Sequence, residues 1–399
     1  MPHAPAVSFS PGAPVPLRSS NRRSILAVLP GRSHVREGAG VRWDHLRLSG
    51  DGADGEHSGD GGAGVGAAAV PLIERRAVAR TFDTPEFRGM TFYEVHARSV
   101  INAVPKASRM PFRWTINPYR GCTHACVYCF ARKTHEYLEM DAGADFDSRI
   151  VVKVNAAERV RAELAAPRWR GEHVAMGTNV DCYQRAEGRY RLMPGILAAL
   201  RDAANPFSIL TKGSLILRDL PLLQEAAERT AVSAAVSVGS VDPDLWRLVE
   251  PGTPAPRKRL QVCAELNDAG IGCSVLMGPV IPYLSDSPAQ LEAAVRRIAE
   301  AGATSVSAIT LHLRPGAREW FMAWLREHHP ELIVPYARLY GSGAYAPEGY
   351  QRRIAARVRE LAARYGVGAG RRGPSRHRPP KHRRVPAPPA PAAEQLSLL

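Results

Sequence analysis

Short apolar runs alternate with segments of helical spacing about six times between residues 112 and 311. Each such unit pairs a strand with a helix, and repeated units place the strands in a parallel sheet with helices outside it. Six units predict an α/β fold built as a partial (β/α)6 barrel of the TIM type. An open doubly wound sheet is the alternative, because one sequence does not reveal strand order. The strands are predicted at 112–116, 173–177, 207–211, 234–238, 272–280 and 305–311, and the helices at 155–166, 192–203, 220–228, 257–269 and 289–301.

The chain ends differ in composition from its middle. Residues 1–70 are rich in Gly, Pro, Ala, Ser and Asp and predict a disordered tail. Residues 71–107 are interpreted as an N-terminal extension that packs on the core, and residues 108–366 as the core barrel itself. Residues 367–399 are basic and Pro-rich and predict a second disordered tail.

Composition excludes several classes of protein. No run approaches 18 uninterrupted apolar residues, so a membrane-spanning helix is not expected. The start of the chain has no basic segment followed by an apolar block, which argues against a secretory signal. Six cysteines in 399 residues do not make a disulfide scaffold, and three of them fall within eight residues. A cytoplasmic protein with a metal or cluster site is the natural interpretation.

The formal net charge is +15, and it is unevenly spread. Seven Arg or Lys and no acidic residue lie between Arg371 and Arg384, which leaves +8 for the other 385 residues. DNA or another nucleic acid is the obvious polyanionic partner for this balance. The alternative is an Arg-rich chain whose basic tail is simply solvated.

The segment from Asn117 to Phe130 contains Cys122, Cys126 and Cys129 at the spacing C-x3-C-x2-C, directly after the first predicted strand. Three thiolates on one loop can all turn toward one metal centre, and thiolates bind both iron–sulfur clusters and zinc. A zinc site needs a fourth ligand, which His124 or His135 could supply. A non-catalytic, DNA-associated protein with structural zinc is therefore the rival hypothesis from another class.

A C-x3-C-x2-C loop with an aromatic residue, Tyr128, before the last cysteine resembles the radical S-adenosylmethionine (SAM) superfamily. The resemblance implies that the three cysteines hold three irons of a 4Fe-4S cluster, whose fourth iron binds the amino and carboxylate groups of SAM. It also implies reductive cleavage of SAM to a 5′-deoxyadenosyl radical that abstracts hydrogen from a substrate. An external electron donor such as flavodoxin or ferredoxin would supply the electron.

The same resemblance assigns further residues at the carboxyl ends of the predicted strands, where such barrels place their sites. Each has a plain structural alternative, either as a helix cap or as part of the core. Substrate contacts are expected at His312 and Arg314. The candidate SAM-binding residues are Tyr128, Gly177, Thr178, Lys212, Ser237, Ser240, Arg259, Pro279 and Val280.

A finer resemblance extends from about residue 91 to 366. Segments 108–121, 177–184, 209–213 and 312–320 are similar to an actinobacterial branch of radical SAM proteins next to spore photoproduct lyase, a DNA repair enzyme. That lyase has a hydrogen-donor cysteine after its second strand, which has no secure match here. Cys182 lies in the right neighbourhood, where similar proteins have proline, and with Tyr183 it is a candidate catalytic residue. The alternative for Cys182 is a neutral substitution, and Cys263 and Cys273 are interpreted as structural.

The last five residues, from Gln395 to Leu399, resemble the peptide by which bacterial DNA-processing proteins bind the replication sliding clamp. A flexible linker that presents an apolar peptide would raise the local concentration on DNA. A chance match in a Leu-rich end is the alternative. The leading hypothesis is a cytoplasmic radical SAM enzyme, of lyase or DNA-repair type, that acts on a DNA lesion or base. The alternative substrate is a small molecule or a protein side chain.

Overall fold

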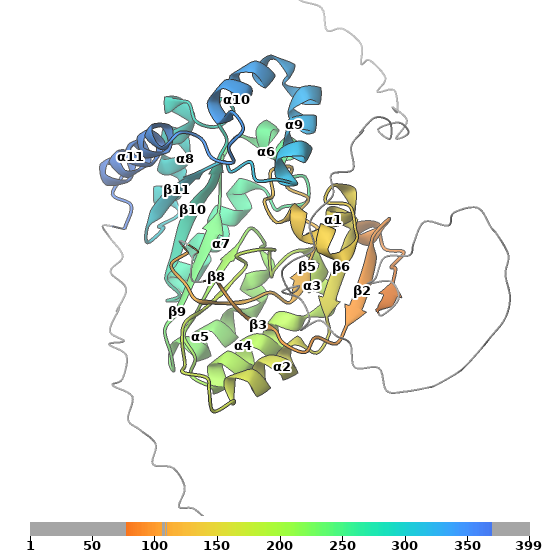
Figure 1. The fold of residues 1–399 in the computed structure, drawn as a ribbon. Helices are drawn as coiled ribbons and strands as arrows, with labels where there is room; N and C mark the ends of the chain where they lie inside the picture. The colour runs from red at the N-terminus through yellow and green to blue at the C-terminus, as the bar shows by residue number, and fades with distance from the viewer. Residues whose placement is uncertain (1–76, 106–107, 109, 369–399) are drawn as a thin grey trace, which may run out of the picture. The chain divides into compact units, whose positions relative to one another are not determined.

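The computed structural model describes residues 77–105, 108 and 110–368 (Figure 1). The predictions for residues 1–70, for the basic run and for the last five residues therefore lie outside the described residues. No helix in the described ranges is long and apolar enough to cross a membrane.

The main sheet has seven strands in the order β11-β10-β9-β8-β7-β4-β3. All neighbours from β4 to β11 are parallel, and β3 (Ile101–Ala103) adds an antiparallel edge to β4. Strand order follows sequence order without reversal, so the doubly wound alternative, which reverses at a switch point, is wrong. Within the described chain the sheet has two open edges, β11 and β3, as a partial barrel has. The six predicted strands are all present as β4 (Trp114–Ile116), β7 (Val174–Met176), β8 (Phe207–Thr211), β9 (Val232–Ser237), β10 (Cys273–Val280) and β11 (Val306–Thr310).

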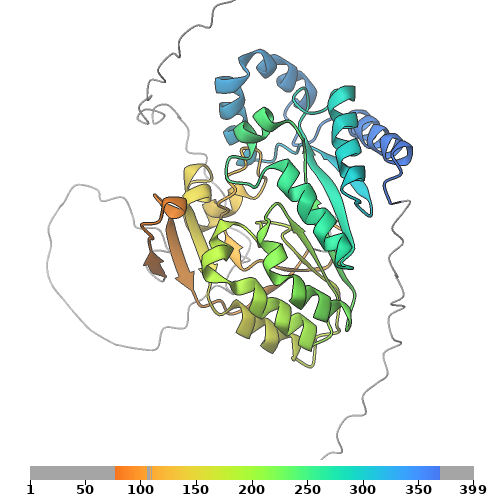
Figure 2. The same cartoon turned by 180° about the vertical axis from the view of Figure 1, so that it is seen from behind.

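Helices connect the parallel strands and cover the sheet (Figure 2). Helix α8 illustrates why the sequence folds this way: Ser287 and Gln290 form a capping box, and Leu291, Ala294, Val295 and Ile298 bury one helical face. Gly270 and Gly302 follow α7 and α8 with φ of 83° and 66°, the left-handed conformation in which helices commonly end. The connecting helices are α2 (Ala156–Leu164), α3 (Arg185–Tyr190), α4 (Leu192–Asp202), η4 (Leu215–Asp219), α5 (Leu220–Ala227), α6 (Pro243–Val249), α7 (Pro256–Asp268) and α8 (Pro288–Glu300).

A second sheet, not predicted from the sequence, has the order β1-β2-β6-β5. Its strands are β1 (Val78–Arg80), β2 (Thr91–Val95), β6 (Arg149–Lys153) and β5 (Tyr119–Arg120), with the short helix η2 (Pro85–Phe87) between β1 and β2. The cysteine loop, residues 121–130, leaves β5 and leads into η3 (Arg132–Leu138) and α1 (Ala144–Ser148). The loop therefore does not follow β4 directly, in contrast to the sequence prediction, because β5 lies between them. Strand β5 has only two residues, which is too short to give a periodic signal in the sequence.

The last helices follow β11: α9 (Ala317–His328), η5 (Pro330–Leu332), α10 (Ile333–Tyr340) and α11 (Glu348–Arg364). Phe321, Leu325 and Tyr336 of this region belong to the same buried apolar cluster as Cys126 and Tyr128. The C-terminal helices thus form part of the apolar wall around the cysteine loop.

Candidate functional site

The three cysteines of the loop lie close together and largely away from solvent. Cys122 and Cys126 are buried, and Cys129 is half-buried. Burial raises the pKa of the Cys122 thiol, and the charges of Asp181, Cys126 and Cys129 raise it further. Burial also raises the pKa of Cys126 to about 12, against the opposing effect of Lys212. The thiols are therefore close enough for their charges to interact. A bound metal cation would favour the deprotonated thiolate form of each one.

The first half of the loop is held by the side-chain amide of Gln184, which is fully buried. Its Nε2 donates to the carbonyl of Gly121 at 3.0 Å, and its Oε1 accepts from the backbone N–H of Thr123 at 2.8 Å. The backbone N–H of Arg185 donates to Thr123 Oγ1 at 3.0 Å. These bonds bracket Cys122 from both sides.

The carboxylate of Asp181 ties this segment to the end of β8. It accepts from the backbone N–H of Lys212 at 2.6 Å and from Thr211 Oγ1 at 2.6 Å. It also lies 3.4 Å from His124 Nδ1 in the cysteine loop. Burial alone would raise the pKa of Asp181, but His124 and these hydrogen bonds lower it to about 2. The ionised carboxylate thus links the segment after β7 to the end of β8 and to the cysteine loop.

The second half of the loop has separate supports. The backbone N–H of Val127 donates to the carbonyl of Val249 at 3.1 Å. Arg132, which is fully buried, donates to the carbonyl of Cys126 at 3.0 Å and pairs with Asp147 at 2.9 Å. These supports of the second half do not involve Gln184.

Lys212 and Ser237, two predicted SAM-binding residues, meet at the carboxyl ends of β8 and β9. Lys212 Nζ donates to Ser237 Oγ at 2.9 Å and lies 5.8 Å from the centre of the Tyr128 ring. Ser237 Oγ donates in turn to the carbonyl of Gly278 at 2.8 Å. The ammonium group therefore lies beside the aromatic residue of the cysteine loop.

Glu250 is the acidic centre of the same region. Its buried carboxylate accepts from the Tyr128 hydroxyl and pairs with Arg259, and Lys212 Nζ lies 4.0 Å away. Burial would raise the pKa of Glu250, but Arg259 and Lys212 outweigh it and lower the pKa. The Arg259 guanidinium also donates to the carbonyls of Ser237 at 2.7 Å and Pro254 at 2.9 Å. Arg259, predicted near the SAM carboxylate, is thus buried and bound to protein groups in this structure.

A small hollow at the ends of β9 and β10 brings together Tyr128, Ser240 and Pro279, three more predicted residues. Ser240 Oγ accepts from the backbone N–H of Asp242 at 3.1 Å, but the residue that caps α6 is Asp242 and not Ser240. Val280, another predicted SAM-binding residue, is the last residue of β10 and is fully buried in the core.

Gly177 and Thr178 follow β7. Gly177 has φ of 74°, and a Cβ there would lie 1.8 Å from the carbonyl oxygen of Leu210, so the position accepts only glycine. Thr178 is half-buried. The close backbone approach at Gly177 is compatible with the predicted Gly-rich SAM segment.

Cys182 and Tyr183, the candidate catalytic residues, both point into the core. Cys182 is 0% exposed and Tyr183 is 1% exposed. Burial raises the pKa of the Cys182 thiol, and the Tyr183 hydroxyl donates to Asp219 at 3.1 Å. A hydrogen-donor role for Cys182 stays a prediction, since this structure encloses the thiol in protein.

An exposed group of aromatic and basic side chains, here called the rim cluster, lies beside the loop. It consists of Phe130, His312, Arg314 and Tyr345. The Arg314 guanidinium carbon lies 5.4 Å from the Phe130 ring centre and 5.9 Å from that of Tyr345. Arg314 also donates to the Tyr345 hydroxyl at 3.0 Å, and the rings of His312 and Tyr345 are 4.6 Å apart. Phe130 is 42% exposed and Tyr345 is 48% exposed, and Arg314 is exposed as well. Two aromatic rings and one cation therefore face solvent, and one of the rings, Phe130, directly follows Cys129.

Comparison with known proteins decides the family. The sequence profile of the Radical SAM superfamily matches residues 116–293, from the end of β4 into α8. The uncharacterized protein Rv2578c of Mycobacterium tuberculosis is 50% identical over 304 residues, covering 76% of this chain and 89% of the relative.

The chain belongs to the radical SAM superfamily.

The solved structure of spore photoproduct lyase complexed with dinucleoside spore photoproduct shares the fold of this radical SAM protein. Its TM-score is 0.52 at 14% identity, over 69% of this chain and 80% of the lyase chain. A variant of the same lyase with bound AdoMet and dinucleoside spore photoproduct gives a TM-score of 0.50 at 14% identity, over 66% and 77% of the two chains.

The cofactors of the superfamily are a 4Fe-4S cluster and SAM, and the residues present fit them. Cys122, Cys126 and Cys129 supply three neighbouring sulfur ligands, the donor type that such clusters require. Lys212 stands near the thiols as a countercharge. The cluster would be held by the three cysteines, and SAM would lie toward the ends of β7 to β10.

The zinc alternative gains no support. His124 faces Asp181, and His135 Nε2 lies 2.9 Å from the carbonyl of Arg149. His124 Nδ1 and His135 Nε2 are therefore engaged with protein groups.

Sequence reasoning missed three residues of the site: Asp181, Gln184 and Glu250. Asp181 and Gln184 lie in the segment between β7 and α3, and Glu250 directly follows α6. That position was the available signal. Their partners are distant in the sequence, so only the fold reveals what each one holds.

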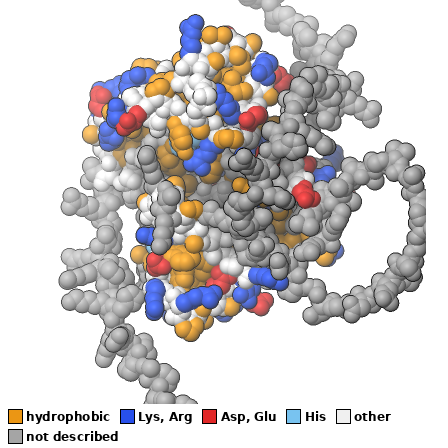
Figure 3. Space-filling view, viewed as in Figure 1, with side chains coloured by type: hydrophobic (Ala, Val, Ile, Leu, Met, Phe, Trp, Pro, Cys, Tyr) orange, Lys and Arg blue, Asp and Glu red, His pale blue; other side chains and the backbone are white. Residues whose placement is uncertain are grey.

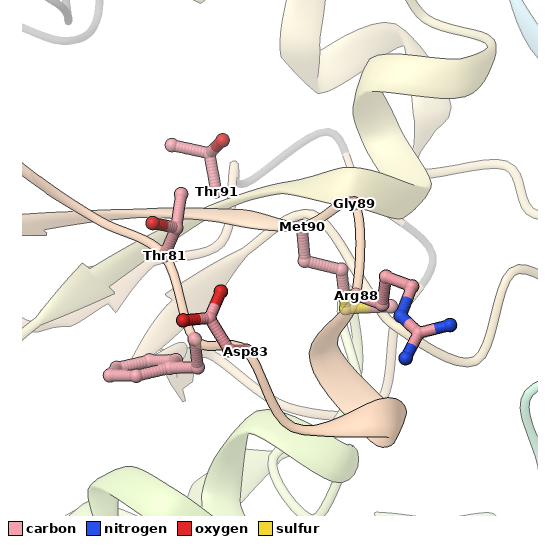
Figure 4. A pocket seen from close by; sticks show the side chains of 7 residues that line it. Thr81, Asp83, Arg88, Gly89, Met90 and Thr91 are labelled. Atoms are coloured by element: carbon pink, nitrogen blue, oxygen red, sulfur yellow. The ribbon is translucent and has the colours of Figure 1, made fainter.

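A separate hollow of about 450 Å³ lies on the β1–β2 side of the second sheet (Figure 4). Its lining contains one carboxylate, Asp83, and one guanidinium, Arg88, among apolar and hydroxyl side chains. None of the residues expected at the cofactor site lines it.

Proposed function

We propose that this radical SAM protein is an enzyme that acts on a nucleic-acid base or base lesion, with electrons from an external donor such as flavodoxin or ferredoxin. When bound, the cluster and SAM supply a 5′-deoxyadenosyl radical that abstracts hydrogen from the substrate. The chain's own residues position and enclose these groups, and the rim cluster binds the base.

Within this proposal, Tyr128 and the ends of β9 and β10 provide the apolar wall for the adenine of SAM. Lys212 and Ser237 offer a cation and a hydroxyl at the carboxyl ends of neighbouring strands, suited to polar groups of SAM. The buried pair of Arg259 and Glu250 holds these two side chains in position. Arg259 donates to the carbonyl of Ser237, and the Glu250 carboxylate pairs with Arg259 and lies 4.0 Å from Lys212 Nζ. Enclosure by the C-terminal helices would keep water from the reacting atoms.

The observation that carries the substrate class is the rim cluster. Exposed aromatic rings and Arg guanidinium planes are the groups on which proteins stack unpaired bases. Phe130 and Tyr345 leave about half of their surface open on either side of Arg314. The cluster begins one residue after the last cysteine, so a base stacked there would lie next to the cofactors.

Two further facts support a nucleic-acid substrate. The net charge of the chain is +15. On the face drawn in Figure 3, Lys and Arg side chains are spread over several places with acidic residues among them, so the charge favours general attraction rather than one binding patch. The structure of spore photoproduct lyase, which shares the fold, was determined with a dinucleoside photoproduct bound.

The binding test uses a fluorescein-labelled single-stranded oligothymidylate and fluorescence anisotropy with anaerobically purified protein. Stacking on one aromatic side chain contributes about 1–3 kcal/mol per base. Tyr345→Ala should therefore weaken binding by roughly 5- to 150-fold. Tyr283→Ala is the matched control, because Tyr283 is 47% exposed, as Tyr345 is 48%, but lies outside the rim cluster.

The activity test reduces the reconstituted enzyme with dithionite, adds SAM and measures 5′-deoxyadenosine with and without ultraviolet-irradiated DNA. We expect 5′-deoxyadenosine in both cases and more of it with DNA. A yield that ignores DNA, together with oligonucleotide binding unaffected by Tyr345→Ala, would favour a small-molecule or protein substrate. An absence of 5′-deoxyadenosine would contradict the enzyme class.

A further inference from the structure

The segment after β7 is built to hold the cysteine loop, and this property does not depend on the substrate. Gln184 is completely buried, and its amide makes one donated and one accepted hydrogen bond to the loop backbone. The two bonds reach Gly121 and Thr123, the residues on either side of Cys122. A buried primary amide that binds a carbonyl and an N–H at the same time fixes the orientation of both peptide groups, and with them the backbone that carries the Cys122 side chain.

Gly121 shows how closely this arrangement is determined. Its φ is 76°, and a Cβ there would lie 2.9 Å from the His135 ring and 3.0 Å from the carbonyl of Arg149. The chain can therefore turn its Gly121 carbonyl toward Gln184 only with glycine at this position.

Gln184 is itself held by its neighbour Asp181. The Asp181 carboxylate accepts from the backbone N–H groups of Tyr183 at 2.9 Å and Lys212 at 2.6 Å. Because Lys212 directly follows β8, the segment cannot move without disturbing the strand ends that face the cofactor site. The contacts thus run from β8 through Asp181 and Gln184 to Cys122.

We propose that Gln184 is a positioning residue for the iron–sulfur cluster, which sets the place of Cys122 relative to the other two ligands. Cys126 and Cys129 lie in the half of the loop that is held by Val249 and Arg132, without a contact to Gln184. Loss of the Gln184 amide therefore loosens one ligand out of three and leaves the other anchors intact.

The test compares Gln184→Leu and Gln184→Glu with the wild type. Leucine removes both bonds, whereas glutamate keeps an acceptor for Thr123 and loses the donor for Gly121. Removal of a group that orients a metal ligand typically lowers metal affinity about 10- to 100-fold. In competition with an iron chelator under anaerobic conditions, we expect Gln184→Leu to lose iron at a chelator concentration lower by that factor. Gln184→Glu should fall between it and the wild type.

Gln290 provides a matched control on α8. Its Nε2 donates to the carbonyl of Leu284 at 2.8 Å, and its Oε1 accepts from the backbone N–H of Ser287 at 3.3 Å. Gln290→Leu removes the same kind of backbone bracket away from the cysteines, so iron retention should not change.

A second readout needs no cluster. Hydrogen exchange on the metal-free full-length chain should show faster exchange at the Thr123 amide in Gln184→Leu, with the Val127 amide unchanged. The proposal is overturned if Gln184→Leu keeps iron as tightly as the wild type. It is equally overturned if Gln290→Leu loses iron to the same extent, or if exchange accelerates across the whole chain, because either result would mean a general loss of stability.

Discussion

The buried pair of Arg259 and Glu250 offers the sharpest test of how the site is supported. Arg259 is 1% exposed, and its guanidinium serves the carbonyls of Ser237 and Pro254 as well as Glu250. Replacement by methionine keeps much of the volume and removes the charge. It leaves the Glu250 carboxylate in the protein interior, with Lys212 Nζ 4.0 Å away as the neighbouring cation.

The magnitude follows from these contacts. Breaking a buried ion pair by removing one partner costs about 3–5 kcal/mol. Each carbonyl left without its donor costs about 1–3 kcal/mol more, unless water enters. Because such costs are not additive, we expect Arg259→Met to lower the free energy of unfolding by at least about 4 kcal/mol. Glu250→Gln alone should cost less, since Arg259 keeps its two carbonyl acceptors.

The double variant separates pairing from simple packing. With Arg259→Met and Glu250→Gln together, no buried charge lacks its partner, so the loss should be smaller than the sum of the single losses by about 2 kcal/mol. Urea unfolding of the full-length chain, followed by tryptophan fluorescence, measures all four proteins. Trp246 reports locally, because its Nε1 donates to Thr253 Oγ1 at 2.9 Å and Thr253 lies beside Arg259. Additivity within about 0.5 kcal/mol would refute the reasoning.

Three other predictions concern separate parts of the chain. Burial, together with Arg120, lowers the pKa of Lys153 to about 7, so between pH 7 and about 10 the unfolded chain binds a proton that the folded chain has released. Stability should therefore rise with pH over this window, and Lys153→Met should remove a slope of about 1 kcal/mol per pH unit in urea titrations; an unchanged slope would contradict the assignment. Replacing any one of Cys122, Cys126 and Cys129 with alanine should abolish the brown colour and most of the bound iron, and a full cluster in one such variant would show that the ligand set is wrong. We also propose that residues 395–399 bind the replication sliding clamp: their deletion should abolish clamp binding in calorimetry and leave 5′-deoxyadenosine formation intact, whereas unchanged affinity would remove the peptide from consideration.

The main sheet and its helices were predictable because their signals are local. Segments 207–211 and 272–280 carry β-forming residues next to clear helix ends, and the structure places β8 and β10 there almost residue for residue. The second sheet was not predictable, since β5 has two residues and β6 joins β2 across more than fifty residues of intervening chain. Pairing between such distant short strands leaves no periodic trace in either segment.

Site residues divide in the same way. The three cysteines were evident from spacing, which is a property of one short segment. Residue type at a strand end suggested Lys212 and Ser237, and the structure brings them into contact. Arg259 was expected to face SAM, but its long side chain is enclosed by protein groups, and only the tertiary fold shows this. Gln184 was passed over for the complementary reason: nothing about an uncharged amide indicates that it serves two distant backbone groups.

The second sheet has a practical consequence for anyone who trims this protein. The superfamily match begins at residue 116, yet strand β2, which borders β6, and strand β3, which borders β4, both lie before it. A fragment cut at the match would remove β1 and β2 from one sheet, and β3 and nearly all of β4 from the other, and so leave unpaired backbone groups next to the segment that carries the cysteines. The smallest unit expected to assemble iron thus begins upstream of β2, and the boundary of a recognisable family resemblance is not the boundary of a foldable piece.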